Sequence, residues 1–318
     1  MIIDLHCDTL CELAKHPGQA LRHNHMMVDL ERMKDSGYLC QCFAIYTNLE
    51  EERDPLAHAK RLASLWMEEM ERNRNLISPA ISAQDILNNN ARGKMSGLLT
   101  IEEGAYLKDI NTLHEFYDMG VRMVALSWNY DNGLTHPNVK EGEDPYTYRN
   151  TTEGLTELGK TIVREMTKLG MVVDVSHMSD ACFYDVAEIV DGPFVASHSN
   201  ARALCPHARN LSDDMMRVIR DHDGVVGVNF YGPFLRQGDE TSRVEDMVRH
   251  ISCMRDVMGI RHIALGSDFD GIDGKLELSG AGEMDRLLEA LRKAGFSRDE
   301  ILDLTQNNAL RVFREIIK

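Results

Sequence analysis

The sequence predicts a single α/β domain over residues 1–318, folded as a (β/α)₈ TIM barrel. Eight apolar runs rich in β-branched residues recur along the chain, and such near-continuous runs are typical of parallel strands buried on both faces. Stretches with helical periodicity separate most of these runs, and this alternation favours a barrel over a doubly wound sheet. A length of 318 residues is ordinary for one such barrel.

The predicted strands and helices follow one another along the whole chain. The expected strands are residues 2–6, 38–46, 97–102, 122–127, 171–176, 194–198, 225–230 and 262–267. The expected helices cover residues 56–72, 155–169, 244–258 and 284–293, and three more begin after Ser82, Ser179 and Ser212, which are residues of the kind that cap helix N-termini. The segment 131–154 shows no pattern and is expected to be either a lid or an irregular connection.

Composition narrows the possible partners. Fifty-one acidic and thirty-five basic side chains give a net charge of −16. Such a charge repels phosphate groups, so we expect no nucleic acid partner and no membrane partner. No apolar stretch approaches the roughly 18 residues of a membrane span, and no leader pattern precedes the first run, so we expect a cytoplasmic protein. The seven cysteines contain no Cys-x-x-Cys pair and are expected to be reduced.

Polar side chains capable of chemistry follow five of the predicted strands. His6 and Asp8 alternate at the end of the first run, so they should emerge on the same side. The others are Glu102, His177, His198 and Asp268. Taken singly, such residues are more often solvated loop acids or hydrogen-bonded core histidines. Because the carboxyl ends of barrel strands meet at one face, their common placement predicts one shared site.

The donor set predicts a metal centre. Two carboxylates and three imidazoles suit zinc or another divalent first-row ion, whereas the few oxygens make calcium a poor fit. Glu102 is central in strand order and is the candidate to bridge two ions. His23 and His25 share the spacing of a ligand pair but lie in a polar stretch, so surface or loop-packing roles are expected there. No phosphate-binding loop or nucleophile elbow is present.

The motifs resemble those of the membrane (renal) dipeptidase family, metal-dependent hydrolases on an amidohydrolase-type barrel. The resemblance covers nearly the whole chain and is carried, in order, by His6-Cys7-Asp8, Ile101-Glu102, residues 173–177 and 197–201, Arg209-Asn210, and residues 228–231, 266–271 and 308–313. Each motif alone is weak, but their order and spacing together are specific.

The resemblance implies two zinc ions per chain. It assigns His6 and Asp8 to one ion and His177 and His198 to the other, with Glu102 as the bridge. It further implies that Asp268 is the catalytic acid/base and that Arg209 binds the free carboxylate of a dipeptide. Tyr231 falls at a further substrate-binding position.

Two positions depart from the family pattern. Trp128 or Asn129 stands where mammalian members have a histidine that contacts the scissile carbonyl, so we expect these residues to contact substrate and oxyanion stabilisation to be altered. Glu103 replaces a glycine that is common after the bridging glutamate, which should shift the pocket floor.

The expected activity is hydrolysis of dipeptides, including those with a C-terminal D-residue, by a water shared between the two ions. Two alternatives stay open: another amidohydrolase-type activity on lactams, lactones or N-acyl amino acids, and a metal-binding homologue with weakened catalysis. The deaminase and phosphotriesterase patterns begin with His-x-His, and the carboxylated-lysine pattern needs a lysine at position 102, so both are disfavoured. The resemblance also allows a homodimer.

Overall fold

The computed structural model describes residues 1–317 and contains a closed barrel of eight parallel strands. The barrel strands are β1 (Ile2–Asp4), β2 (Tyr38–Tyr46), β4 (Met95–Glu102), β5 (Val121–Ala125), β6 (Val172–Asp174), β7 (Val195–Ala196), β8 (Val225–Val228) and β10 (Ile263–Leu265). Each pairs in parallel with the next, and β10 pairs with β1 to close the ring. The predicted fold class is therefore confirmed.

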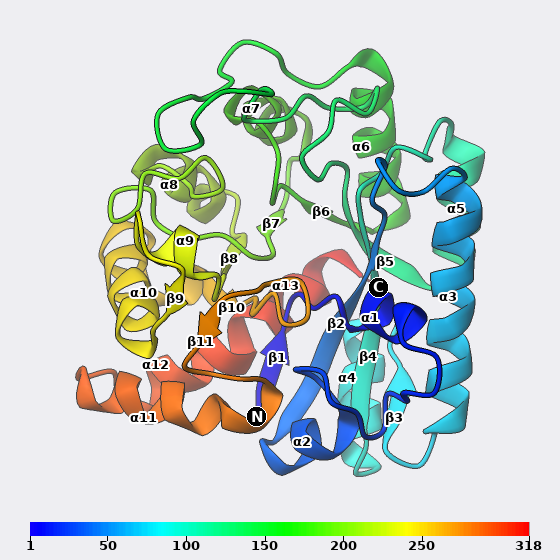
Figure 1. Cartoon of the computed structure of the whole chain (residues 1–318), viewed down its shortest axis with the longest axis vertical. Coiled ribbons are helices and arrows are strands. Elements are labelled where there is room, and N and C mark those ends of the chain that lie inside the picture. Colours follow the sequence, from blue (N-terminus) through cyan, green and yellow to red (C-terminus); the bar gives the residue numbers. More distant parts are fainter. Residues whose placement is uncertain (318) are drawn as a thin grey trace.

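Helices surround the strands, as Figure 1 shows. They are α1 (Thr9–Lys15), α2 (Leu30–Asp35), α3 (Pro55–Arg72), α4 (Ala83–Ala91), α5 (Ile110–Asp118), α6 (Glu157–Leu169), α7 (Asp180–Ile189), α8 (Asp213–Asp221), α9 (Gly232–Leu235), α10 (Val244–Met258), α11 (Met284–Lys293), α12 (Arg298–Leu302) and α13 (Asn308–Ile316). Short 3₁₀ turns lie at Ile260–His262 and Ala281–Glu283, and a π-helical turn at Asp303–Asn307 joins α12 to α13. Among these helices of residues 1–317, none has the length and apolar composition needed to cross a bilayer.

Local sequence explains where the predicted helices begin. The hydroxyl oxygens of Ser82, Ser179 and Ser212 each accept a hydrogen bond from the backbone N–H three residues further on, so all three cap helices as expected. The apolar face of α3 buries Leu62, Trp66 and other side chains against the barrel.

Three short strands were not predicted: β3 (Ile77–Pro79), which pairs with the amino end of β4, and the pair β9 (Thr241–Ser242) and β11 (Lys275–Leu276). None of the three is buried along its whole length, so no continuous apolar run marks it in the sequence. Helices α1, α5, α9, α12 and α13 were also missed.

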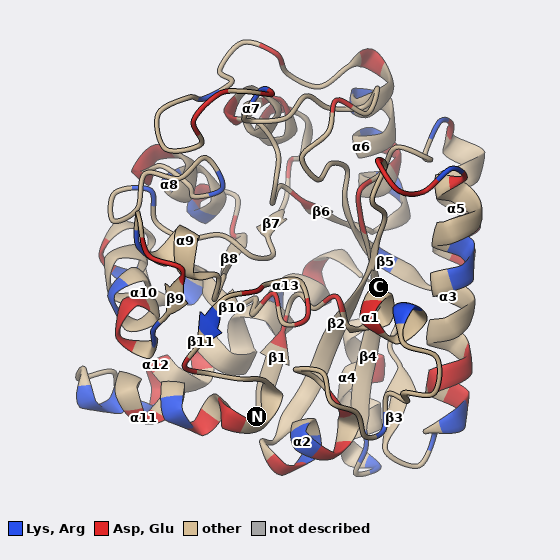
Figure 2. Cartoon of the chain, viewed as in Figure 1, with Lys and Arg blue, Asp and Glu red and all other residues tan. Residues whose placement is uncertain are grey.

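The core has two parts. One fills the space between strands and outer helices, and the other gathers side chains from the strands, such as Leu98, Val172 and Val225, against Leu310 and Phe313 of α13. Helix α13 therefore packs at the amino ends of the strands, and the carboxyl ends remain for chemistry. In Figure 2 both signs of charge are spread over the outer helices, and acidic segments lie among the loops at the middle of the barrel.

The connection from β5 to α6 contains no helix or strand. Trp128 and Asn129, at the start of this connection, line the central cavity. Among the described residues that line it, none lies between 131 and 154. That placement favours the irregular connection over the lid.

Candidate metal centre

The polar residues predicted from the strand ends meet at the carboxyl face of the barrel. His6 and Asp8 follow β1, Glu102 ends β4, and the remaining three follow β6, β7 and β10, namely His177, His198 and Asp268. All six are at least nine-tenths buried. Burial of so many ionisable groups is costly unless they are paired or hold a cation.

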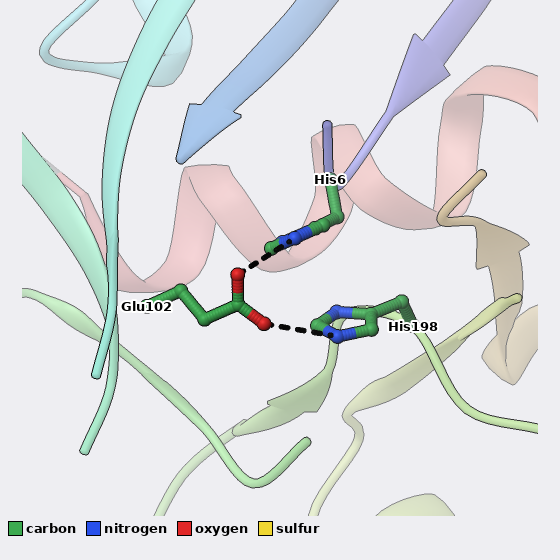
Figure 3. Close-up of side chains that lie close together, drawn as sticks. All are labelled: His6, Glu102 and His198. Atoms are coloured by element: carbon green, nitrogen blue, oxygen red, sulfur yellow. Dashed lines mark ion pairs between the residues drawn. The ribbon is translucent and has the colours of Figure 1, made fainter. Parts of the chain in front are cut away.

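Glu102 lies between two groups of ligand atoms. On one side its Oε2 lies 3.3 Å from His6 Nε2, which in turn lies 3.3 Å from Asp8 Oδ2. On the other side its Oε1 lies 2.8 Å from His177 Nε2 and 3.6 Å from His198 Nε2. Figure 3 shows His6 and His198 facing opposite oxygens of the carboxylate. This is the arrangement expected of a bridging ligand.

These separations fit metal coordination. With bonds of about 2.0–2.2 Å, the ligand atoms around a tetrahedral ion lie about 3.3–3.6 Å apart. The atoms of the His6 group match this spacing, and those of the His177 group, with 2.8 Å between the two Nε2 atoms, are slightly closer.

Three atoms of the site lack the positively charged partner that a cation would supply. Asp8 Oδ1 is buried and has no hydrogen-bond donor within residues 1–317. The Nε2 atoms of His177 and His198 face each other, while Nδ1 of His177 lies 3.2 Å from Asn129 Oδ1 and Nδ1 of His198 lies 2.7 Å from Ser197 Oγ. If both Nδ1 atoms donate, two lone pairs meet, and a cation between them removes the repulsion. The residues present therefore fit a metal.

Electrostatics in the metal-free site lead to the same conclusion. Burial, with the neighbouring Asp8 carboxylate, raises the pKa of Glu102, and burial also raises the pKa of Asp268. Burial lowers the pKa of His177 and His198 well below the usual range, which keeps them neutral as ligands must be. Burial opposes the charged form of His6 as well, but Glu102 and Asp8 together outweigh it and raise its pKa. A bound dication would stabilise the ionised carboxylates.

Asp268 stands at the edge of the ligand group. Its Oδ1 lies 3.8 Å from His6 Nε2, and its Oδ2 accepts a hydrogen bond of 2.8 Å from Asn229 Nδ2. Gly271 passes so close that a Cβ there would lie 2.2 Å from Asp8 Oδ2 and 2.6 Å from Asp268 Oδ1. Asn229 and Gly271 belong to motifs that the sequence shows, but neither role was predicted.

Backbone strain concentrates at this site. His177, Asp268 and Glu103 have φ values of 71°, 64° and 79°. These values lie in the left-handed region, which residues other than glycine rarely adopt. Such strain persists where the surrounding structure holds a functional geometry.

Arg209 is buried beside the centre. One of its terminal nitrogens donates to the backbone oxygen of His198 at 3.3 Å, whereas its buried Nε has no partner among the described residues. Burial lowers the pKa of Arg209 to about 10, so the guanidinium stays charged at neutral pH. A buried charge with a free donor suits an incoming carboxylate.

The residues that depart from the family pattern lie beside the ligand group. The Trp128 ring packs against Tyr46 and Tyr130 at 5.3 and 5.1 Å and lies 6.1 Å from the His177 ring. Glu103 is fully buried, and its carboxylate accepts hydrogen bonds from the backbone N–H groups of Ala105 and Trp128 and from Asn132 Nδ2 at 2.6–2.9 Å. Glu103 thus fastens the Trp128 segment, a role that sequence did not reveal.

A cavity of about 1290 Å³ opens onto the centre. Its walls include Trp128, Asn129, Arg209 and Tyr231, together with Asp8, Glu102, His177 and Asp268. His25 is exposed on the same wall, and His23 is exposed 3.5 Å from Glu31, so neither joins the ligand group. The cavity brings the predicted substrate residues and metal ligands together.

A parallel barrel with a carboxylate between two groups of ligand atoms at its strand ends defines a metal-dependent hydrolase. The profile of the membrane dipeptidase family, peptidase family M19, matches residues 1–318, and the chain belongs to this family. The expected enzyme class, a metal-dependent dipeptidase, is thereby confirmed.

Dipeptidases and metallopeptidases are among the proteins similar to this chain. The chain is 32% identical to dipeptidase aclJ of Aspergillus oryzae over 76% of its own length and 57% of that protein's length. The crystal structure of a metallopeptidase, dipeptidase AC, superposes with a TM-score of 0.88 at 30% identity, covering 99% of this chain and 98% of that one. A metallopeptidase from Rhodobacter sphaeroides, liganded with a phosphinate mimic of L-Ala-D-Ala, gives 0.87 at 29% identity, covering 100% and 99%.

Proposed function

We propose that this chain is a zinc dipeptidase holding two ions, and that it hydrolyses dipeptides, including those with a C-terminal D-residue. The observation that carries the proposal is the position of Glu102 between two groups of ligand atoms, with Arg209 beside them. His6 and Asp8 would bind one ion, His177 and His198 would bind the other, and Glu102 would be a ligand of both. When bound, the pair would supply Lewis acidity that activates a water and polarises the peptide carbonyl.

Asp268 is suited to move the proton. Asp268 lines the cavity next to His6. Asn229 donates a hydrogen bond to its Oδ2, and its Oδ1 remains directed at the ligand group. From there Asp268 would accept the water's proton and pass it to the leaving amine.

Arg209 would select the length of the substrate. Its guanidinium would bind the C-terminal carboxylate of a dipeptide at a fixed reach from the reacting carbonyl. A longer peptide has an amide at that place, so the buried charge would lose its partner. The inclusion of dipeptides with a C-terminal D-residue rests on the ligand of the Rhodobacter relative.

Trp128 and Asn129 would complete the site from the β5 connection. Asn129 contacts His177 rather than standing free, and the indole covers the same side of the cavity. Trp128 and Asn129 therefore replace the family histidine that is expected to contact the carbonyl. The indole of Trp128 offers one hydrogen-bond donor. We propose that this weakens carbonyl contact and shapes substrate preference. A cytoplasmic location, a single domain and a homodimer remain predictions.

A screen of free dipeptides tests the proposal. L-L and L-D dipeptides, N-acyl amino acids and lactones would be offered to the purified protein with zinc and with chelator. The expected result is zinc-dependent release of amino acids from dipeptides alone. Preferred hydrolysis of N-acyl amino acids or lactones would favour the alternative amidohydrolase activity, and zinc binding without hydrolysis would favour the weakened homologue.

A further inference from the structure

Two buried side chains, Ser197 and Asp174, form a chain of contacts behind His198, on the side away from the proposed metal. Ser197 Oγ contacts His198 Nδ1 at 2.7 Å and donates to Asp174 Oδ2 in a short hydrogen bond. The other carboxylate oxygen of Asp174 accepts the backbone N–H groups of Ser176 and Ser197, both at 2.9 Å. All these residues are almost completely buried, so water does not compete for the contacts.

The chemistry of the three groups fixes the direction of the hydrogen bonds. An ionised carboxylate only accepts, so the single hydroxyl proton of Ser197 is used on Asp174. The hydroxyl then has only lone pairs for His198, whose Nδ1 must carry the proton. The lone pair of the neutral ring is thereby placed on Nε2, which faces His177 Nε2 and Glu102.

Packing prevents Ser197 from leaving this position. A Cβ at Gly227 or Gly266 would lie 1.9 or 1.7 Å from the backbone oxygen of Ser197, so the neighbouring strands approach as closely as glycine permits. The backbone N–H of His198 also donates to Ser176 Oγ at 3.1 Å. The ring is held from both its backbone and its Nδ1 edge.

We propose that Asp174 and Ser197 are positioning residues that hold His198 in the tautomer able to bind metal, and so tighten the second of the two ions. The proposal rests on the proposed metal pair and adds two residues that touch neither metal nor substrate. Metal-bound histidines commonly depend on such a partner, whose loss typically weakens metal affinity about 10- to 100-fold.

The barrel contains a matched control. Asp4 and Ser267 form the same kind of contact, with Ser267 Oγ donating to Asp4 Oδ2 at 2.6 Å and the Ser267 N–H donating to Asp4 Oδ1 at 2.9 Å. Both residues are fully buried. Within residues 1–317 the Ser267 hydroxyl contacts no imidazole nitrogen. Loss of either serine hydroxyl leaves a buried carboxylate oxygen short of a donor. Only Ser197 contacts the imidazole of a ligand, whereas Ser267 Oγ reaches the backbone oxygen of His6 at 3.3 Å.

The test compares zinc affinity in five proteins that all span residues 1–318. Wild type, Ser197→Ala, Asp174→Asn, the double variant of these two and Ser267→Ala would be stripped of metal and titrated with zinc against a chromophoric chelator. Thermal midpoints of the metal-free proteins would report folding. In Asp174→Asn the amide can donate to Ser197, which frees the hydroxyl proton for His198 Nδ1 and favours the wrong tautomer.

We expect Ser197→Ala and Asp174→Asn each to lower the affinity for one of the two zinc ions about 10- to 100-fold and to leave the affinity for the other unchanged. The double variant should lose no more than either single variant, since both act through one chain. Ser267→Ala should lower the thermal midpoint as much as Ser197→Ala does, with both zinc affinities retained. This result cannot come from destabilisation alone.

Two results would overturn the inference while the proposed function stands: wild-type zinc affinities in folded Ser197→Ala, or an equal loss in Ser267→Ala. A wild-type protein that binds no zinc would overturn the proposed function and the inference with it. The two failures are therefore distinguishable.

Discussion

Gly271 is the position where one added methyl group should damage catalysis without damaging the fold. A Cβ there would lie 2.2 Å from Asp8 Oδ2 and 2.6 Å from Asp268 Oδ1, whereas ordinary contact begins at 3.4 Å. Relief of both contacts needs movements of 3.4 − 2.2 = 1.2 Å and 3.4 − 2.6 = 0.8 Å. Misplacement of reacting groups by about 1 Å can cost about 100-fold, or about 2.7 kcal/mol in the activation barrier.

We therefore expect Gly271→Ala to lower kcat/KM for a dipeptide about 100-fold at saturating zinc. Gly271 is exposed on the cavity wall, so the thermal midpoint should change little. The control is Gly192→Ala, because a Cβ at Gly192 meets no atom within 4 Å. Steady-state kinetics with zinc analysis would measure both variants. Wild-type kcat/KM and zinc content in Gly271→Ala would refute the account of how the two carboxylates are placed.

Three further substitutions test separate parts of the site. Asp268→Asn should keep the zinc content and lower kcat about 10²- to 10⁴-fold, and undiminished turnover would remove Asp268 from its role. Arg209→Met should lower kcat/KM about 10- to 100-fold for free dipeptides but much less for dipeptide amides, and an equal loss on both would contradict carboxylate binding. Glu103→Gln should lower the free energy of unfolding by about 1–3 kcal/mol and shift the fluorescence of Trp128. The reason is that the one carbonyl oxygen of Gln cannot accept all three hydrogen bonds that the carboxylate accepts. An unshifted spectrum would contradict the anchoring of Trp128 by Glu103.

The barrel could be predicted because its strands are buried on both faces. Such strands appear in sequence as continuous apolar runs, and all eight runs correspond to barrel strands. The predicted runs often extend one or two residues beyond the strands, as at His6 and Ser176, because the chain stays buried while the backbone turns toward the site. Strands that are only partly buried, such as β9, carry no comparable pattern.

The convergence of the ligands could be predicted for a related reason. Each ligand ends a strand, and in a parallel barrel all strand ends meet at one face. Their division between two ions required the family resemblance, since spacing alone does not show which side of Glu102 each residue takes.

The supporting residues could not be predicted because their partners are distant in sequence. Asn229 contacts Asp268, 39 residues away, and Glu103 contacts Trp128 and Asn132 across a loop. Gly271 matters only because two carboxylates from different strands approach it. These roles depend on the assembled barrel.

Hydrolysis of dipeptides with two zinc ions is the proposed activity of this site. It is tested most directly by zinc content and dipeptide hydrolysis in one preparation, before chelation, after it and after zinc is restored. We expect two zinc ions per chain, loss of hydrolysis with chelator and its return with zinc. Full hydrolysis by a metal-free preparation would contradict it.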